Sequence, residues 1–135
     1  MAYGSAAAGP FDAEAQASLL RTCCATNARL GVTGVLLYRN GNFLQVLEGE
    51  EGVVRDLYLR IRLDPRHTGC ITLLDGALDA RMFPASLMAF HAGADLSDED
   101  RRAFDAFELR ARALTAGRPE RVVQKLIEVF QRIMR

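Results

Sequence analysis

The 135-residue sequence contains no tryptophan, only two histidines and three cysteines. The cysteines show neither a CxxC spacing nor a nearby histidine cluster, which argues against a disulfide framework or a zinc site. The only imidazoles are those of His67 and His91, and no convincing Ser-His-Asp set includes either of them. A glycine-rich phosphate loop and a pair of catalytic carboxylates are also missing. Because no pairing of a nucleophile with a base is evident, the sequence argues against an enzyme.

Net charge and long apolar runs are absent as well. The 17 basic residues balance the 17 acidic ones, which argues against a surface that follows the phosphates of a nucleic acid. No apolar run approaches the roughly 20 residues of a membrane helix, and the N-terminal residues lack the features of a signal peptide. We therefore expect a cytoplasmic protein without nucleic-acid or membrane partners. The proportion of hydrophobic residues, 50%, is typical of a globular chain, and the length suits one domain.

What the sequence does contain is an alternation of strand and helix signals. Asp12 is a suitable N-cap for the first helix. Asn40-Gly41 is a hairpin turn between two apolar strands, and Asp64-Pro65 opposes continuation of the second helix. The predicted elements are a short, weakly signalled strand within 1–7, a helix over 13–29, strands over 32–38 and 42–48, a helix over 51–63, strands over 70–74 and 87–90, and helices over 97–114 and 119–134.

The order βαββαβ, followed by a strand and two helices, predicts an α+β fold with a ferredoxin-like sheet. Both hairpin strands are apolar on both alternations, so both sheet faces must be covered. We expect the first two helices to cover one face and the C-terminal pair to cover the other, or to join a partner subunit. The last helix has more apolar residues than one buried stripe needs, which favours a homo-oligomer. A monomer whose two C-terminal helices simply cover the second face remains an alternative.

Two amides lie at positions where apolar residues are expected. Gln45 shares a strand face with Phe43 and Leu47, so its side chain needs hydrogen-bond partners. Asn27 follows Cys23 by four residues on the inward stripe of the first helix. Each also has an ordinary interpretation, since a core glutamine can bond the backbone and an asparagine can cap a helix C-terminus.

Three further polar residues lie near this side of the predicted sheet. Arg60 precedes Asp64 by four residues, which predicts an ordinary ion pair between them. His67 is expected in a loop, where a lone histidine is mostly solvated. Tyr3 is expected to be a half-buried core residue of a first strand that frays, because only two residues precede it. The residues alone thus predict an α+β domain with a polar pocket under two helices.

Four segments carry a resemblance to a known family. They read YGS at 3–5, NARLGVTGVLLYRNGNFLQVLEG at 27–49, DPRH at 64–67 and RMFPASLMAF at 81–90. On these motifs, and on a spacing from Tyr3 to Asn27 to Gln45 that needs no gap, the chain resembles the BLUF family of flavin-based blue-light sensors. The resemblance implies a BLUF flavin-binding domain over 1–92. The two-helix extension over 93–135 would then pack on the sheet or form an oligomer interface.

The resemblance also implies a cofactor, FAD, with FMN as the alternative, whose isoalloxazine ring lies between the first two helices. Tyr3 would donate an electron and a proton to the photoexcited flavin, and Gln45 would bond both and rearrange on illumination. Met88 matches the family methionine that approaches Gln45 from the last strand. Further implied flavin contacts are Leu20, Cys23, Asn27 at the polar edge of the ring, Arg60 and Asp64 at its pyrimidine end, and Arg66 and His67 near the entrance.

The implied function is that of a sensory flavoprotein without catalytic turnover, which passes its signal to an unknown downstream protein. Ser86 stands where the family often has a tryptophan, and we expect photoactivity to survive while the signal relay or its lifetime differs. There are two alternatives: a light-inactive scaffold that keeps the fold and dimerises, and a flavin-dependent oxidoreductase that uses the same pocket. The absorption spectrum before and after blue light would separate them.

Overall fold

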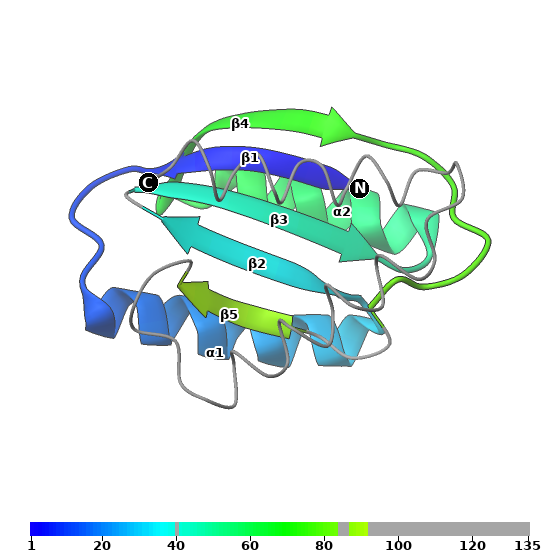
Figure 1. Cartoon of the computed structure of the whole chain (residues 1–135), viewed down its shortest axis with the longest axis horizontal. Coiled ribbons are helices and arrows are strands. Elements are labelled where there is room, and N and C mark those ends of the chain that lie inside the picture. The colour runs from blue at the N-terminus through cyan, green and yellow to red at the C-terminus, as the bar shows by residue number, and fades with distance from the viewer. Residues whose placement is uncertain (40, 84–86, 92–135) are drawn as a thin grey trace.

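The computed structural model describes residues 1–39, 41–83 and 87–91, and the chain forms seven elements there (Figure 1). The predicted helices over 97–114 and 119–134, and with them the extension over 93–135, lie outside these residues. The elements are β1 (Ala2–Ala7), α1 (Ala13–Leu30), β2 (Thr33–Arg39), β3 (Asn42–Glu48), α2 (Glu51–Leu63), β4 (His67–Leu74) and β5 (Leu87–His91).

The strands form one sheet in the order β4-β1-β3-β2-β5. The first four strands pair antiparallel with their neighbours, and β5 joins β2 in parallel at the edge. This is the predicted ferredoxin-like arrangement with one added strand, so the predicted fold class is confirmed. Because β3 lies between β1 and β2, residues that are far apart in the sequence meet at the centre of the sheet.

Local signals account for both ends of α1. Asp12 Oδ1 accepts a hydrogen bond from the Ala15 N–H at 2.8 Å, as expected of an N-cap. Gly31 ends the helix with φ at 65°, a left-handed conformation that favours glycine. Asn27 lies inside the helix and is buried, so the alternative interpretation of Asn27 as the C-cap is wrong.

The second helix begins with a less common cap. The carboxylate of Glu50 accepts hydrogen bonds from the Gly52 and Val53 N–H groups, both at 3.1 Å. The helix ends before Asp64, which has extended backbone angles, as the following proline requires. Both helices were therefore predicted within one residue of their observed ends.

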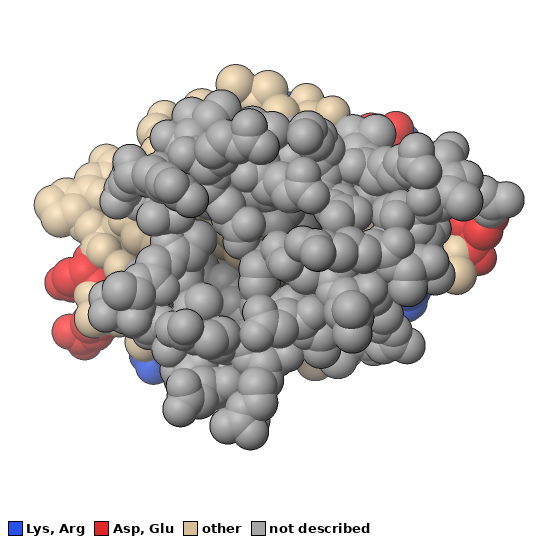
Figure 2. Space-filling model, in the orientation of Figure 1, with Lys and Arg blue, Asp and Glu red and all other residues tan. Residues whose placement is uncertain are grey.

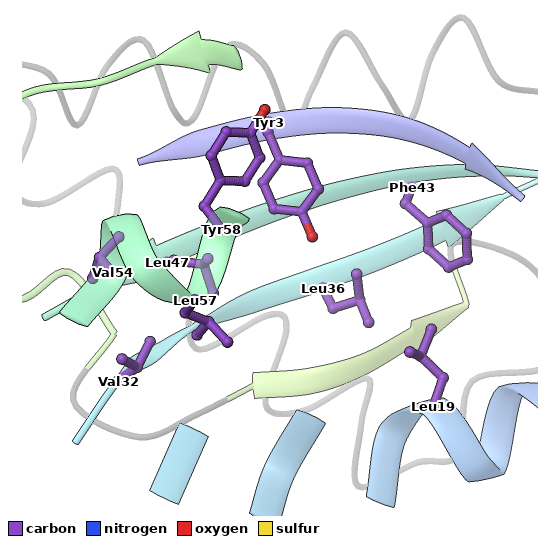
Figure 3. Packing of buried hydrophobic residues seen from close by; sticks show 9 residues of the cluster. All are labelled: Tyr3, Leu19, Val32, Leu36, Phe43, Leu47, Val54, Leu57 and Tyr58. Atoms are coloured by element: carbon purple, nitrogen blue, oxygen red, sulfur yellow. The ribbon is translucent and has the colours of Figure 1, made fainter. Parts of the chain in front are cut away.

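The core lies between the sheet and the two helices, which cover the same face (Figures 1 and 3). On the opposite face of the sheet, residues such as Val35, Leu37 and Leu44 are buried too. This confirms the prediction that both faces of the hairpin strands are covered. Gln45 is on the helix-covered face, among apolar neighbours. The buried cluster consists of Tyr3, Leu19, Val32, Leu36, Phe43, Leu47, Val54, Leu57 and Tyr58.

The first strand is held firmly, contrary to the expectation of a frayed end. β1 pairs with β3 on one side and β4 on the other, so both of its backbone edges are occupied. The N-terminal ammonium of Met1 donates to Leu47 O at 2.8 Å, and Leu47 N–H donates back to Met1 O at 2.8 Å. Tyr3 is 0% exposed rather than half-buried. Pairing on both edges of β1 thus holds Tyr3 in the sheet.

None of the helices in the described ranges is long and apolar enough to cross a membrane. On the face shown in Figure 2, acidic and basic side chains of the described residues both lie toward the periphery of the view.

Candidate functional site

A cleft of about 220 Å³ opens between α1 and α2 above the sheet. The inner turns of both helices form its walls, and the turn between α2 and β4 closes one side. Its lining residues are Leu19, Thr22, Cys23, Thr26, Asn27 and Arg29 of α1, Leu36 and Gln45 of the sheet, Leu57, Arg60 and Ile61 of α2, and Asp64, Arg66 and His67.

Tyr3 and Gln45 form a buried pair on the sheet side of this cleft. The two residues are register partners in β1 and β3, and the Tyr3 hydroxyl donates a hydrogen bond to Gln45 Oε1. Burial raises the pKa of the Tyr3 hydroxyl well above 10, so the phenol is neutral near neutral pH. Gln45 lines the cleft, and Tyr3, which does not, reaches it through this amide.

Tyr3 is also held by a second aromatic ring. The centroid of the Tyr58 ring lies 4.9 Å from that of Tyr3, and the two rings are side by side in Figure 3. Thr72 Oγ1 donates to the Tyr58 hydroxyl at 3.0 Å, and the Arg62 guanidinium lies 5.9 Å from the Tyr58 ring centroid. The contacts of Tyr58 hold this second ring in place, and it packs against the Tyr3 ring.

Asn27 contributes an amide with an unsatisfied donor. Its side chain is 2% exposed and lines the cleft, and Nδ2 has no hydrogen-bond partner within the described residues. A buried polar group without a partner costs about 1–3 kcal/mol, so a ligand atom that accepts this hydrogen bond would remove that cost. The geometry at Asn27 therefore fits a ligand that presents a hydrogen-bond acceptor.

The predicted ion pair between Arg60 and Asp64 is wrong. Asp64 instead binds Arg66, whose Nε and Nη2 donate to the two carboxylate oxygens at 3.0 and 2.6 Å. These hydrogen bonds hold the pKa of Asp64 below its ordinary value. Asp64 lies beyond the last helical turn in an extended conformation, so the i,i+4 geometry of a helix does not reach it. Arg60 borders the cleft and is exposed.

His67 begins β4 and is partly buried, so the prediction of a solvated loop histidine is also wrong. Its Nδ1 is 3.0 Å from Ser5 Oγ, and its ring centroid lies 4.7 Å from that of Phe43. Desolvation lowers the pKa of His67 below 6.5, which favours the neutral imidazole. The pairing of β1 with β4 brings Ser5 and His67 together.

The structure distinguishes two neighbouring residues of α1. Cys23 lines the cleft, and burial raises the pKa of its thiol to about 11, so the thiol stays protonated. Leu20 packs at the border of the core cluster outside the cleft lining, whereas Leu19, which we did not select from the sequence, lines it.

Met88 occupies a register position close to Gln45. Leu36 of β2 pairs with Gln45 of β3 on one side and with Met88 of β5 on the other. The row Tyr3, Gln45, Leu36 and Met88 therefore crosses four neighbouring strands. The position of Met88 agrees with its expected place on the last strand.

Sequence reasoning also missed several wall residues. Leu57 and Ile61 line the cleft from α2, and Thr22, Thr26 and Arg29 line it from α1. The period of α1 could have indicated the last three, because they lie three or four residues apart along the stripe that contains Cys23.

The donor set fits a flat heteroaromatic ring such as that of a flavin. Leu19, Leu57 and Ile61 supply apolar lining, and the unpartnered Nδ2 of Asn27 supplies a hydrogen-bond donor in the same cleft. Flavins carry carbonyl oxygens and ring nitrogens that accept hydrogen bonds, so the residues present fit the group that the sequence resemblance implies.

A family model described as sensors of blue light using FAD, named BLUF, matches residues 1–89. The beta subunit of a photoactivated adenylate cyclase from Euglena longa is 41% identical over 85 residues, which are 63% of this chain and 10% of the relative. A beta-like subunit protein, FB, from Euglena gracilis is 36% identical over 96 residues, 71% of this chain and 11% of the relative. The chain thus spans about a tenth of the length of these relatives.

Solved structures show the same similarity. A bacterial light-regulated adenylyl cyclase superposes with a TM-score of 0.63 at 30% identity, covering 92% of this chain and 34% of that chain. The calcium and cyclic-diGMP complex of BlrP1 from Klebsiella pneumoniae gives a TM-score of 0.70 at 27% identity, covering 96% and 32%. The family match over residues 1–89, together with these relatives and the cleft described above, shows that the chain belongs to the BLUF family, the sensors of blue light that use FAD.

Proposed function

We propose that this chain is a blue-light photoreceptor module that binds a flavin in the cleft between α1 and α2 and signals through the hydrogen bonds of Gln45. One observation carries the proposal: the buried Tyr3–Gln45 pair lies at the same cleft as the unpartnered Nδ2 of Asn27. A switchable amide and a buried donor without a partner thus line one cleft, and a redox-active phenol is hydrogen-bonded to that amide.

A bound flavin supplies the absorption of blue light and an excited state that accepts an electron. Tyr3 is neutral and its proton lies on the hydrogen bond to Gln45 Oε1, so a proton that leaves the phenol moves toward that oxygen. The amide of Gln45 carries an acceptor and donors at one site, and its rotation or tautomerisation exchanges what it presents to the cleft. Asn27 would hold the polar edge of the ring through Nδ2, and the Cys23 thiol, which burial keeps protonated, also lines the cleft.

The remaining residues fit positions around the ring. Arg60 and the Asp64–Arg66 pair lie on one side of the cleft, suitable for the pyrimidine end, and His67 lies beside them. We propose FAD as the natural cofactor, because the family description names it. Flavin released by heat from purified protein, separated by chromatography, identifies the cofactor, and a protein that binds neither FAD nor FMN on reconstitution would overturn the proposal.

The switch is tested with Gln45→Leu, which removes the amide and keeps a similar volume. We expect the variant to retain flavin and to lose the reversible red shift that blue light produces in the wild type. Gln16→Leu provides a matched control, since Gln16 lies on α1 outside the cleft lining and should leave the light response intact. A normal red shift in Gln45→Leu would show that Gln45 is not the switch.

The electron donor is tested with Tyr3→Phe, which removes the hydroxyl and preserves the ring that contacts Tyr58. We expect flavin binding without the normal photocycle in transient absorption, and Tyr38→Phe as the control should keep it. If Tyr3→Phe and the wild type behave alike, Tyr3 is not the donor.

The output is proposed to leave the cleft through β5. Met88 is separated from Gln45 by one strand in the same register row, and the chain continues from β5 toward residues 93–135. We propose a sensory domain over 1–92 without catalytic turnover, and an extension over 93–135 that forms homo-oligomer contacts and passes the signal to a separate protein. Light scattering in darkness and in blue light tests this, and a monomer at micromolar concentration in both states would refute the oligomer.

A further inference from the structure

Tyr58 is a second phenol in contact with the proposed electron donor. The ring centroids of Tyr3 and Tyr58 lie 4.9 Å apart, and both rings belong to the buried core cluster (Figure 3). The chain contains three tyrosines and no tryptophan, so its only phenol or indole rings are those of Tyr3, Tyr38 and Tyr58. Two phenols in contact have similar intrinsic redox potentials, so Tyr58 lies within reach of an electron transfer to an oxidised Tyr3. The surroundings of the two rings decide whether that transfer takes place.

The two hydroxyl groups differ in what accepts their proton. The Tyr3 hydroxyl donates to Gln45 Oε1, so oxidation of this phenol can release its proton along a formed hydrogen bond. The Tyr58 hydroxyl oxygen instead accepts a hydrogen bond from Thr72 Oγ1 at 3.0 Å, and within the described part of the chain this is its only hydrogen bond. A phenol becomes strongly acidic when it loses an electron, so a phenol whose proton has no acceptor is harder to oxidise. Tyr58 is thus the poorer electron donor of the two.

A positive charge also lies at Tyr58 and not at Tyr3. The Arg62 guanidinium carbon is 5.9 Å from the centroid of the Tyr58 ring, at the outer limit of a cation–π contact. No described guanidinium or ammonium group lies over the Tyr3 ring, and no described carboxylate pairs with Arg62. Removing an electron from the Tyr58 ring would turn the attraction to Arg62 into a repulsion between two positive charges. Arg62 therefore opposes oxidation of Tyr58 selectively.

We propose that Arg62, acting through Tyr58, confines the light-driven oxidation to Tyr3. The inference rests on the proposed function, in which the excited flavin accepts an electron from Tyr3 and the Tyr3 proton moves to Gln45 Oε1. In the transfer that Arg62 opposes, Tyr58 gives an electron to the Tyr3 radical, Tyr3 takes its proton back from Gln45, and Tyr58 loses its own proton to solvent. The Tyr3–Gln45 hydrogen bond would then return to its starting state, with the radical left on Tyr58. Arg62, which lies outside the cleft lining, is thus a positioning residue for the site of oxidation.

The test measures tyrosyl radicals by electron paramagnetic resonance in flavin-loaded protein frozen under blue light. Arg62→Gln removes the charge, and we expect at least about twofold more long-lived tyrosyl radical than in the wild type, because a cation–π contact at an exposed site changes an equilibrium about two- to fivefold. Arg62→Lys keeps the charge and should show the wild-type yield. The increase should disappear when Arg62→Gln is combined with Tyr58→Phe. Arg55→Gln is the matched control, because Arg55 lies on the same helix and its guanidinium binds Glu51 and Asp75 instead.

A second readout needs no flavin. Azide radicals produced by pulse radiolysis oxidise tyrosines of the flavin-free chain, and peptide mass spectrometry locates the oxidised rings. We expect more oxidised Tyr58 relative to Tyr3 in Arg62→Gln than in the wild type or in Arg55→Gln. An unchanged radical yield or unchanged Tyr58 oxidation in Arg62→Gln, or an increase that persists with Tyr58→Phe, would overturn the inference while the flavin site stands. A wild type that binds flavin and shows no reversible red shift would instead refute the proposed function.

Discussion

Replacing Gln45 with leucine tests the Tyr3–Gln45 hydrogen bond independently of any cofactor. The Tyr3 hydroxyl is completely buried and donates to Gln45 Oε1, so the substitution leaves this donor without its partner and without access to water. Gln45 itself is 2% exposed, and leucine has a similar volume on a face that is otherwise apolar. The change therefore removes hydrogen bonding with little change in packing.

The expected cost follows from the burial of the hydroxyl. A buried donor that loses its partner costs about 1–3 kcal/mol, so Gln45→Leu should lower the free energy of unfolding by that amount. In a Tyr3→Phe background the hydroxyl is already absent, and the same substitution should cost less. We expect the two substitutions to be non-additive, with an interaction free energy of about 1 kcal/mol or more.

The wild type, Tyr3→Phe, Gln45→Leu and the double variant form a double-mutant cycle. Urea unfolding of the flavin-free chain in the dark measures the stability of all four proteins, provided that the m-value stays constant. Tyr3→Phe combined with Leu37→Ala is the control cycle, because Leu37 is buried on the other face of the sheet and should be additive with Tyr3. Additivity of Tyr3→Phe and Gln45→Leu within about 0.5 kcal/mol would refute the inference that this pair forms the buried hydrogen bond.

Glu48, Gly34 and His67 allow three further tests. The buried Glu48 carboxylate accepts two backbone N–H bonds, both at 2.9 Å, from the segment before β5, so Glu48→Ala should cost about 2–4 kcal/mol in urea unfolding, and a near-neutral result would contradict this. A Cβ at Gly34 would lie 1.8 Å from Val46 O, so Gly34→Ala should lower stability by about 3 kcal/mol or more, whereas an unchanged Tm would disprove the close approach. Because burial lowers the pKa of His67, the unfolded chain takes up a proton more readily than the folded chain as the pH drops below about 6.5. The free energy of unfolding should therefore decrease as the pH decreases, by at most about 1.4 kcal/mol per pH unit. His67→Asn should remove this part of the pH dependence, and an identical pH profile in both proteins would argue against it.

The elements of the fold could largely be predicted because their signals are local. Asp12 and Gly31 bound α1 through backbone geometry that involves a few neighbouring residues. The start of β4 at His67 was missed, because pairing with β1 extends that strand beyond its apolar residues. Pairing partners come from distant parts of the chain, and a local pattern does not reveal them.

The candidate site, too, was predictable where local sequence signals decide and was mispredicted where contacts formed by the folded chain decide. Periodicity alone places Gln45 on the helix-covered face of β3 and Asn27 on the inward side of α1, and the structure has both there. The partner of Asp64 was mispredicted because the helix ends before it and frees its side chain to meet Arg66. The role of each site residue toward a flavin stays a prediction that the experiments above address.

By itself the sequence determined the order of the described strands and helices, their buried faces and the polar residues on those faces. Each of these features depends on residues a few positions apart. Only the tertiary structure decided that Tyr3 is fully buried, that its hydroxyl meets Gln45, and that Ser5 meets His67. These contacts depend on β1 entering the sheet between β3 and β4. Burial there desolvates the phenol and the imidazole and shifts their pKa values, and no local pattern within the first strand carries that information.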